Sequence, residues 1–266
     1  MDVTQFVNSV LSNADYYVLL LFRVSGVVFS SPLFGRVGVP QMVKMSLALS
    51  LSLLFFNTVP PAVPIVYSSL IGYLLIIAGE VMLGIALAYV TSLFFAITFV
   101  GGQMIDMQIG FGIVNVYDPQ NNTQIPMIGN MLNSLLLIVF FGVNGHHRLF
   151  LLMKTTLERI PVGSALINPA IGLTVVEIFA KSFLLGVMVA LPVVASGLVL
   201  EIAIGVLVRT VPQMNVFVVG LPIKILVGFF ILLTSLPMFV SFSETVFGEM
   251  FSGVEAMFAT FAIRLA

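Results

Sequence analysis

Seven ionisable residues lie inside otherwise apolar segments, and these side chains are the ones most suited to chemistry. They are Arg23, Glu80, Asp106, Glu177, Lys181, Glu201 and Lys224. An ionisable group at the centre of a bilayer costs at least about 2.5–3.5 kcal/mol on insertion scales, so it pairs, lines a water-filled cavity or contacts another subunit. The sequence therefore predicts that these seven charges are buried in protein and serve assembly, unless they carry ions.

Glu177 and Lys181 lie four residues apart, with the acid first, which is the favourable order for a pair on one helix. They could form a proton relay, as paired ionisable groups do in coupled transporters. They could also form an ion pair that neutralises its own insertion cost, and we favour this interpretation. Two interpretations are also open for Glu80, which lies between Gly79 and Gly84: a structural contact with a neighbouring helix, or an ion site. The same two interpretations are open for Arg23.

No pattern in the sequence indicates catalysis, a metal site or a nucleotide site. The chain has no cysteine, which excludes thiolate chemistry, iron–sulfur clusters and cysteine-rich zinc sites. His146 and His147 are adjacent and would point about 100° apart on a helix, so a polar turn is the expected role. Gly101-Gly102 and Gly110-Phe111-Gly112 match neither phosphate-binding fingerprint. Ser196 has no activating partners. The sequence predicts no catalytic residue and no cofactor.

The composition is that of an integral membrane protein. Apolar residues make up 60% of the 266 positions, and the mean hydropathy is +1.19, whereas ordinary soluble domains are roughly 45–50% apolar. The ten Lys and Arg nearly cancel the eleven Asp and Glu and are scattered singly, so nucleic acid is not an expected partner. No Lys or Arg precedes Arg23, which does not fit the basic start of a cleaved signal peptide.

Apolar stretches predict the helices that must position these residues. The stretches are 16–29, 45–56, 66–100, 127–143, 149–160, 171–200 and 216–242. At 35 residues, 66–100 is too long for one untilted crossing, so two helices or one bent helix are expected, with the break at Gly79-Glu80 and Gly84. Pro192 is a possible kink in 171–200. We therefore expect one all-α membrane domain over residues 1–266.

Two further segments have their own pattern. Residues 149–160 carry charges at helical spacing and predict an amphipathic helix that Pro161 closes, after a turn at 144–147. In the last twenty residues acids alternate with Phe and Met, which predicts an amphipathic helix lying on a surface.

Residues 101–126 predict a loop with ordered content, because they hold four Gly, two Asp and two Pro around a short apolar patch. An apolar backbone segment of this kind must be buried in protein or line a cavity. It could be a re-entrant packing loop or a movable plug in a pore, at about residues 106–122, with glycines for freedom and apolar side chains as the seal. The candidate plug residues are Gly110, Phe111, Gly112, Ile113, Val114, Asn115, Val116, Tyr117 and Asp118.

The order and spacing of several short motifs resemble the FliR family of flagellar export-gate proteins and their counterparts in virulence type III secretion systems. The motifs are Arg23 to Pro32 with Pro40 and Lys44, Gly79-Glu80 with Gly84, Gly101-Gly102 with Asp106, Gln108 and Gly110, Asp118-Pro119, Asn144-Gly145-His146, and Pro212-Gln213-Met214-Asn215-Val216-Phe217 with Gly220-Leu221-Pro222-Ile223-Lys224. The last pair is the strongest, and Gly220-Leu221-Pro222 favours the flagellar branch.

The resemblance implies a pore-forming subunit rather than an enzyme. It implies assembly with the small P and Q membrane subunits, contact with the B and A components, and location in the bacterial inner membrane at the flagellar basal body. Helical hairpins would stack into a spiral hetero-oligomeric pore, in which the buried charges form ion pairs between subunits. Unfolded flagellar proteins would pass through it, and the plug loop would close it.

The residues alone leave other functions open. They indicate a multipass protein with a gated polar pathway, for which a proton- or ion-coupled transporter is the main alternative. A transporter requires carboxylates that converge near the midplane, often in repeated half-helices, whereas the acids here are dispersed and no internal repeat is present. A membrane scaffold that conducts nothing itself is the third possibility.

Overall fold

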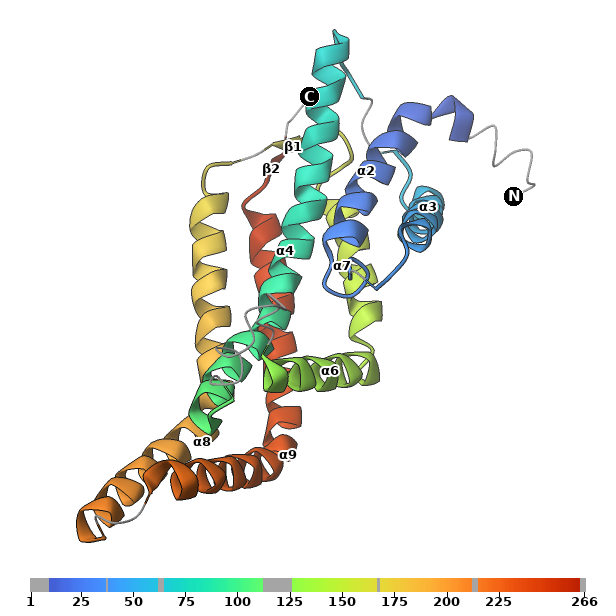
Figure 1. Cartoon of the computed structure of the whole chain (residues 1–266). Coiled ribbons are helices and arrows are strands. Elements are labelled where there is room, and N and C mark those ends of the chain that lie inside the picture. The colour runs from blue at the N-terminus through green and yellow to red at the C-terminus, as the bar shows by residue number, and fades with distance from the viewer. Residues whose placement is uncertain are drawn as a thin grey trace. The chain divides into compact units, whose positions relative to one another are not determined.

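The computed structural model describes residues 10–36, 38–61, 65–111, 126–166, 168–211 and 215–263 (Figure 1). Its helices are α2 (Ala14–Ser30), α3 (Gln41–Thr58), α4 (Leu70–Ile109), α6 (Met127–Gly142), α7 (Gly145–Arg159), α8 (Ile171–Thr210) and α9 (Val216–Ala259). Two very short strands, β1 (Ala165–Leu166) and β2 (Ala262–Ile263), pair antiparallel with Ala165 opposite Ile263. The predicted all-α fold class is confirmed.

The chain divides into two compact units. The first unit comprises Met1–Ser92, Gly145–Ile178 and Met250–Ala266, and the second comprises Leu93–Asn144 and Phe179–Glu249. The long helices α4, α8 and α9 each contribute residues to both units. The expected single domain over residues 1–266 stays a prediction.

The core of the first unit forms where α2 packs beside α3 (Figure 1). The buried side of α2 consists of Tyr16, Leu19, Leu20, Val24 and Val28, which recur at intervals of three or four residues except for the adjacent Leu19 and Leu20. This spacing places them on one face of a helix. They meet Phe55 and Phe56 of α3 and Met153 and Leu157 of α7. The Tyr16 hydroxyl donates a 2.7 Å hydrogen bond to the Val59 carbonyl, so its polar end is satisfied in the core.

Three helices in the described part of the chain, α4, α8 and α9, are long and apolar enough to cross a membrane. Only 17–28% of their most apolar stretches is buried within the chain. Large apolar side chains such as Leu75, Leu173 and Leu226 are at least 69% exposed. Lipid or other subunits must therefore cover most of these faces.

The structure corrects two predictions about α4. Of the two forms expected for 66–100, two helices with a break at Gly79-Glu80 and Gly84 are wrong, because α4 runs without interruption from Leu70 to Ile109 as one helix. The predicted loop over 101–126 is also wrong for residues 101–109, which are helical. In both places glycines serve close helix packing: a Cβ on Gly84 would collide with backbone atoms of Arg23 and Gly26, and one on Gly102 with the backbone of Gly129. Such contacts offset the helix-breaking tendency of glycine.

The remaining predictions are mixed. The helices near 127–143 and 149–160 are confirmed as α6 and α7. Asn144 turns the chain with φ +57°, but α7 begins directly after it, so His146 and His147 are helical rather than part of the turn. The amphipathic C-terminal segment is helical as predicted, as the end of α9. Its apolar side chains Phe247, Met250 and Val254 are buried in the protein, while Glu244 and Glu255 are exposed, as the amphipathic pattern predicts.

Candidate functional site

The first charged centre joins Arg23 of α2 to Glu80 of α4. The Arg23 Nε and Nη2 atoms donate to the two carboxylate oxygens of Glu80, at 2.5 and 3.0 Å. The two residues are 1% and 0% exposed. This bidentate geometry is the strongest arrangement that a guanidinium and a carboxylate adopt. The sequence predicts that both charges need partners. In the structure, Arg23 and Glu80 are partners of each other.

The surrounding backbone completes this centre. Arg23 Nη1 donates to the carbonyl of Ile160, at 2.8 Å, just beyond the end of α7, where helix carbonyls lack intrahelical partners. The backbone N–H of Gly163 donates to Glu80 Oε1, at 2.8 Å. All of these groups belong to one chain. The expectation of ion pairs between subunits is therefore wrong for Arg23 and Glu80, whose positions on neighbouring helices already bring them together.

A second polar contact fixes the start of α6 against α4 in the second unit. Asp106 is 1% exposed, and its Oδ1 accepts a 3.3 Å hydrogen bond from the backbone N–H of Ile128. A carboxylate at this position complements the unpaired N–H groups of a helix start. Its Oδ2 atom has no hydrogen-bond partner among the described residues. The Gly102–Gly129 backbone contact lies one turn earlier on α4.

The C-terminal end of α4 is held between α8 and α9. Added Cβ atoms show how tight this packing is: on Gly197 of α8 a Cβ would collide with the Gln108 side chain, and on Gly228 of α9 with Ile109. Gly110 then takes φ +104°, a conformation that side-chain-bearing residues rarely adopt. The Phe111 ring follows and packs edge-on against Phe229, with 5.8 Å between centroids.

A third charged group lies beside this helix end. The Lys224 Nζ atom of α9 donates to Glu201 Oε1 of α8 at 2.6 Å, and the Gln108 side-chain amide donates to the same oxygen at 3.4 Å. The Lys224 and Glu201 side chains are 30% and 44% exposed. We call these three residues the polar cluster. As in the first pair, Lys224 and Glu201 therefore form their ion pair within the chain.

The remaining predicted charges, Glu177 and Lys181, both lie on α8 and are exposed at the surface of the chain. Their burial by other subunits stays a prediction. The sequence did not single out Gln108, Gly197 and Gly228 as site residues. Glycines inside two apolar helices were the available signal, because such glycines commonly mark close helix contacts.

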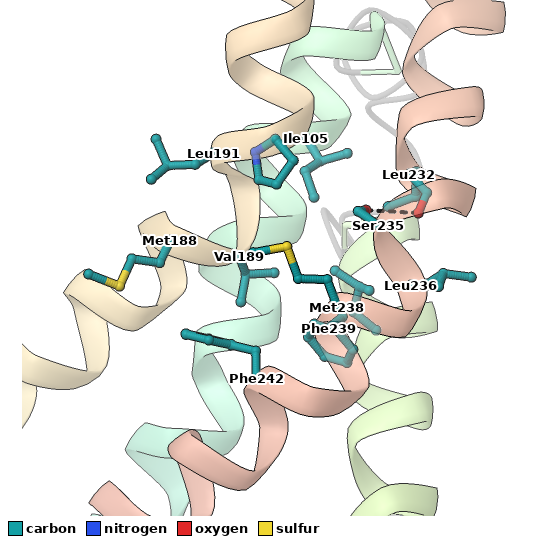
Figure 2. A pocket seen from close by; sticks show the side chains of 12 residues that line it. Ile105, Met188, Val189, Leu191, Leu232, Ser235, Leu236, Met238, Phe239 and Phe242 are labelled. Carbon is teal, nitrogen blue, oxygen red and sulfur yellow. Dashed lines mark hydrogen bonds between the residues drawn. The ribbon is translucent and has the colours of Figure 1, made fainter.

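The second unit also contains an apolar pocket of about 380 Å³ (Figure 2). Its walls include Ile105 of α4, Leu132 of α6, Met188 and Pro192 of α8, and Phe239 and Phe242 of α9. Ser235 is the polar side chain in its wall, and its hydroxyl donates to the Leu232 carbonyl. A cofactor or an ion requires polar ligands, and this lining supplies none that is unengaged. Elsewhere in the described part, no three His, Asp or Glu residues gather as a metal site.

Comparison with known proteins assigns the family. Residues 15–250 match the family described as bacterial export proteins, family 1. The flagellar biosynthetic protein FliR of Bacillus subtilis is 33% identical over 85% of this chain and 88% of its own length. The chain belongs to the FliR family. The FliR proteins of Escherichia coli and Aquifex aeolicus are each 29% identical to it, over 91% and 94% of this chain and 92% and 98% of their own lengths.

Two of the motifs behind the FliR resemblance are described only in part. Of the candidate plug, Gly110 and Phe111 belong to the described structure, while residues 112–118 lie outside the described residues. Pro212, Gln213 and Met214 also lie outside them. Asn215 directly precedes α9, and its side-chain oxygen accepts a 3.4 Å hydrogen bond from the Val218 N–H. This contact caps the first turn of α9.

Proposed function

We propose that this chain is a pore-forming subunit of the flagellar type III export gate in the bacterial inner membrane, at the base of the flagellum. Its membership of the FliR family supports a role in flagellar export. The three membrane-length helices support an integral membrane location. The proposed activity is the passage of unfolded flagellar proteins and not catalysis.

The proposed subunit works within a hetero-oligomer. Its partners would be the P and Q membrane subunits of the gate, with further contacts to the B and A components. The largely uncovered apolar faces of α4, α8 and α9 support this proposal, because a spiral stack of helical hairpins would cover such faces. Glu177 and Lys181, exposed on α8, would then contact other subunits.

In this proposal residues 110–118 form the plug that closes the channel. The observation that carries it is the structure of the α4 end. Close packing against Gly197 and Gly228 fixes α4 up to Ile109, and Gly110 then redirects the backbone with φ +104°. A plug requires such a fixed base followed by a residue with conformational freedom. The apolar side chains after Gly110 would exclude water and ions from the closed channel.

Deletion of residues 110–114 tests the plug. The assembled complex should then leak small ions, measured as loss of membrane potential in cells that express it, while its subunits still copurify. Deletion of residues 120–123 is the matched control, because it also shortens the segment but leaves 110–118 in place. A complex that assembles with the 110–114 deletion and stays tight would contradict the plug.

A further inference from the structure

In the second unit, the helices α8 and α9 form a hairpin (Figure 1), and its two sides differ in chemistry. One side carries the Glu201–Lys224 ion pair and faces Gln108. On an ideal helix at about 100° per residue, Gly205 lies about 40° from Glu201, on the same side. Val206 and Val199 lie about 140° and 160° from it. Both valines are more than 60% exposed, so the opposite side of α8 is apolar.

The exposure of the Glu201–Lys224 ion pair indicates which side of the α8–α9 hairpin can face lipid. The Lys224 and Glu201 side chains retain 30% and 44% of their accessible surface within the chain. Charged groups that face acyl chains carry the insertion cost without compensation from water. The valine side fits acyl chains or the apolar face of another subunit, whereas the polar-cluster side requires water or a polar surface.

We infer that the polar cluster and the adjoining face of α8 at Gly205 line the aqueous path through the gate and contact the polypeptide in transit. This inference rests on the proposed function. An added Cβ at Gly205 meets nothing within 4 Å, so this part of the face is open in the chain. Because Glu201 and Lys224 neutralise each other, the polar cluster carries no net charge. A neutral polar cluster suits unfolded chains of either charge, since it attracts neither sign strongly.

Three other charges lie on α8. Glu177 and Lys181 precede Glu201 by 20 residues or more, which is about 30 Å or more along a helix. Arg209 lies one turn beyond Gly205, in the last turn of α8, and adds a positive charge at the end of this face. At the level of Glu201, the apolar residues Val199, Ile202 and Val206 occupy the other directions and are all exposed.

The chain has no cysteine, so a single introduced thiol can be measured without background. We would introduce Gly205→Cys on the polar side and, as a matched control one residue away, Val206→Cys. Each assembled complex would be placed in lipid nanodiscs, so that both membrane surfaces are accessible, and treated with a sulfonated maleimide. Labelling after denaturation gives the total thiol.

The Gly205→Cys thiol should react about tenfold faster or more than the Val206→Cys thiol, because a thiol among acyl chains stays protonated and inaccessible to a charged reagent. An export substrate fused to a folded domain, which stalls in the gate, should slow the labelling of Gly205→Cys only. If Gly205→Cys prevents assembly, Glu201→Cys places the thiol at the pair itself.

Equal protection of both thiols, in complexes that still secrete, would overturn the inference and indicate that a partner subunit covers the polar side. If a stalled substrate does not slow the labelling of Gly205→Cys, the inferred contact with the polypeptide in transit is overturned. The proposed function fails by a different result, namely secretion that continues without this chain.

Discussion

Two ion pairs of this chain, Arg23–Glu80 and Lys224–Glu201, differ in almost every physical respect. Arg23 and Glu80 are 1% and 0% exposed, and backbone groups near the end of α7 occupy their remaining hydrogen-bonding capacity. Lys224 and Glu201 are 30% and 44% exposed and share one oxygen with Gln108. The first pair is complete within the chain and holds helices together. The second leaves part of its surface uncovered within the chain, so the same chemistry is buried in one place and exposed in the other.

Removing one member of the buried pair should have the largest effect. Glu80→Gln leaves the Arg23 guanidinium without its counter-charge, and breaking a buried pair in this way costs about 3–5 kcal/mol. We expect little folded protein in the membrane, measured as the monodisperse fraction of detergent-extracted protein on size exclusion. Secretion should fall in proportion to that loss.

The double variant Arg23→Met with Glu80→Leu is the control for the buried pair. It removes both charges, so it should recover part of the folded protein that Glu80→Gln loses. The recovery should be incomplete, because the Ile160 carbonyl and the Gly163 N–H lose their partners. Normal levels of folded Glu80→Gln would contradict the structural role of this pair.

The next effect concerns backbone contact rather than charge. Gly102→Ala places a Cβ against the Gly129 backbone, and overpacking of this kind typically costs about 1–3 kcal/mol. The thermal midpoint of the purified protein should fall clearly. Gly142→Ala is the matched control, because an added Cβ there meets nothing within 4 Å. If the two alanine variants melt together, α4 and α6 do not approach as closely as described.

Variants of the exposed pair should separate stability from function. Glu201→Lys removes the attraction to Lys224 and should change stability by about 1 kcal/mol or less, because partly exposed pairs contribute little. It also gives the polar cluster a positive charge, so secretion should decrease more than the amount of assembled complex does. The swap Glu201→Lys with Lys224→Glu restores neutrality and should restore secretion. A swap that secretes no better than the single variant would argue against a neutral lining.

The smallest effect is expected at Lys154 and Glu158 on α7. Their side chains are 42% and 53% exposed, with 3.5 Å between Nζ and Oε1. An exposed pair of this spacing contributes about 0.3–0.5 kcal/mol. Glu158→Gln should therefore leave both the thermal midpoint and secretion unchanged within error. A clear loss of secretion would contradict this expectation and indicate that Glu158 makes a functional contact with another component.

The sequence predicts much of the helical framework, because apolar stretches identify helices whatever their partners are. Its errors share one cause. Gly84 and Gly102 suggest breaks when α4 is considered alone, yet each is required where another backbone touches the helix. The C-terminal acids and phenylalanines indicate an amphipathic helix but not that its apolar side lies in the protein interior. Local pattern gives the element, and tertiary contact decides its ends and its environment.

The candidate site was predictable to a similar extent. The insertion cost of charge indicated that Arg23 and Glu80 need partners, but 57 residues separate them and nothing local identifies the pair. Glu201 and Lys224 were selected for the same reason. The contact of Gln108 with Glu201, and the packing of Gly197 and Gly228 against the end of α4, become visible only when three helices are placed together.

The central claim is that this chain is required for flagellar export, and secretion tests it most directly. The gene would be deleted, and hook and filament proteins would be measured in the culture medium and in whole cells. The account predicts that these proteins are made but remain inside the cells, and that a plasmid copy restores their export. Normal export and swimming without the gene would contradict it and leave a virulence secretion system or a small-solute transporter as the function to test.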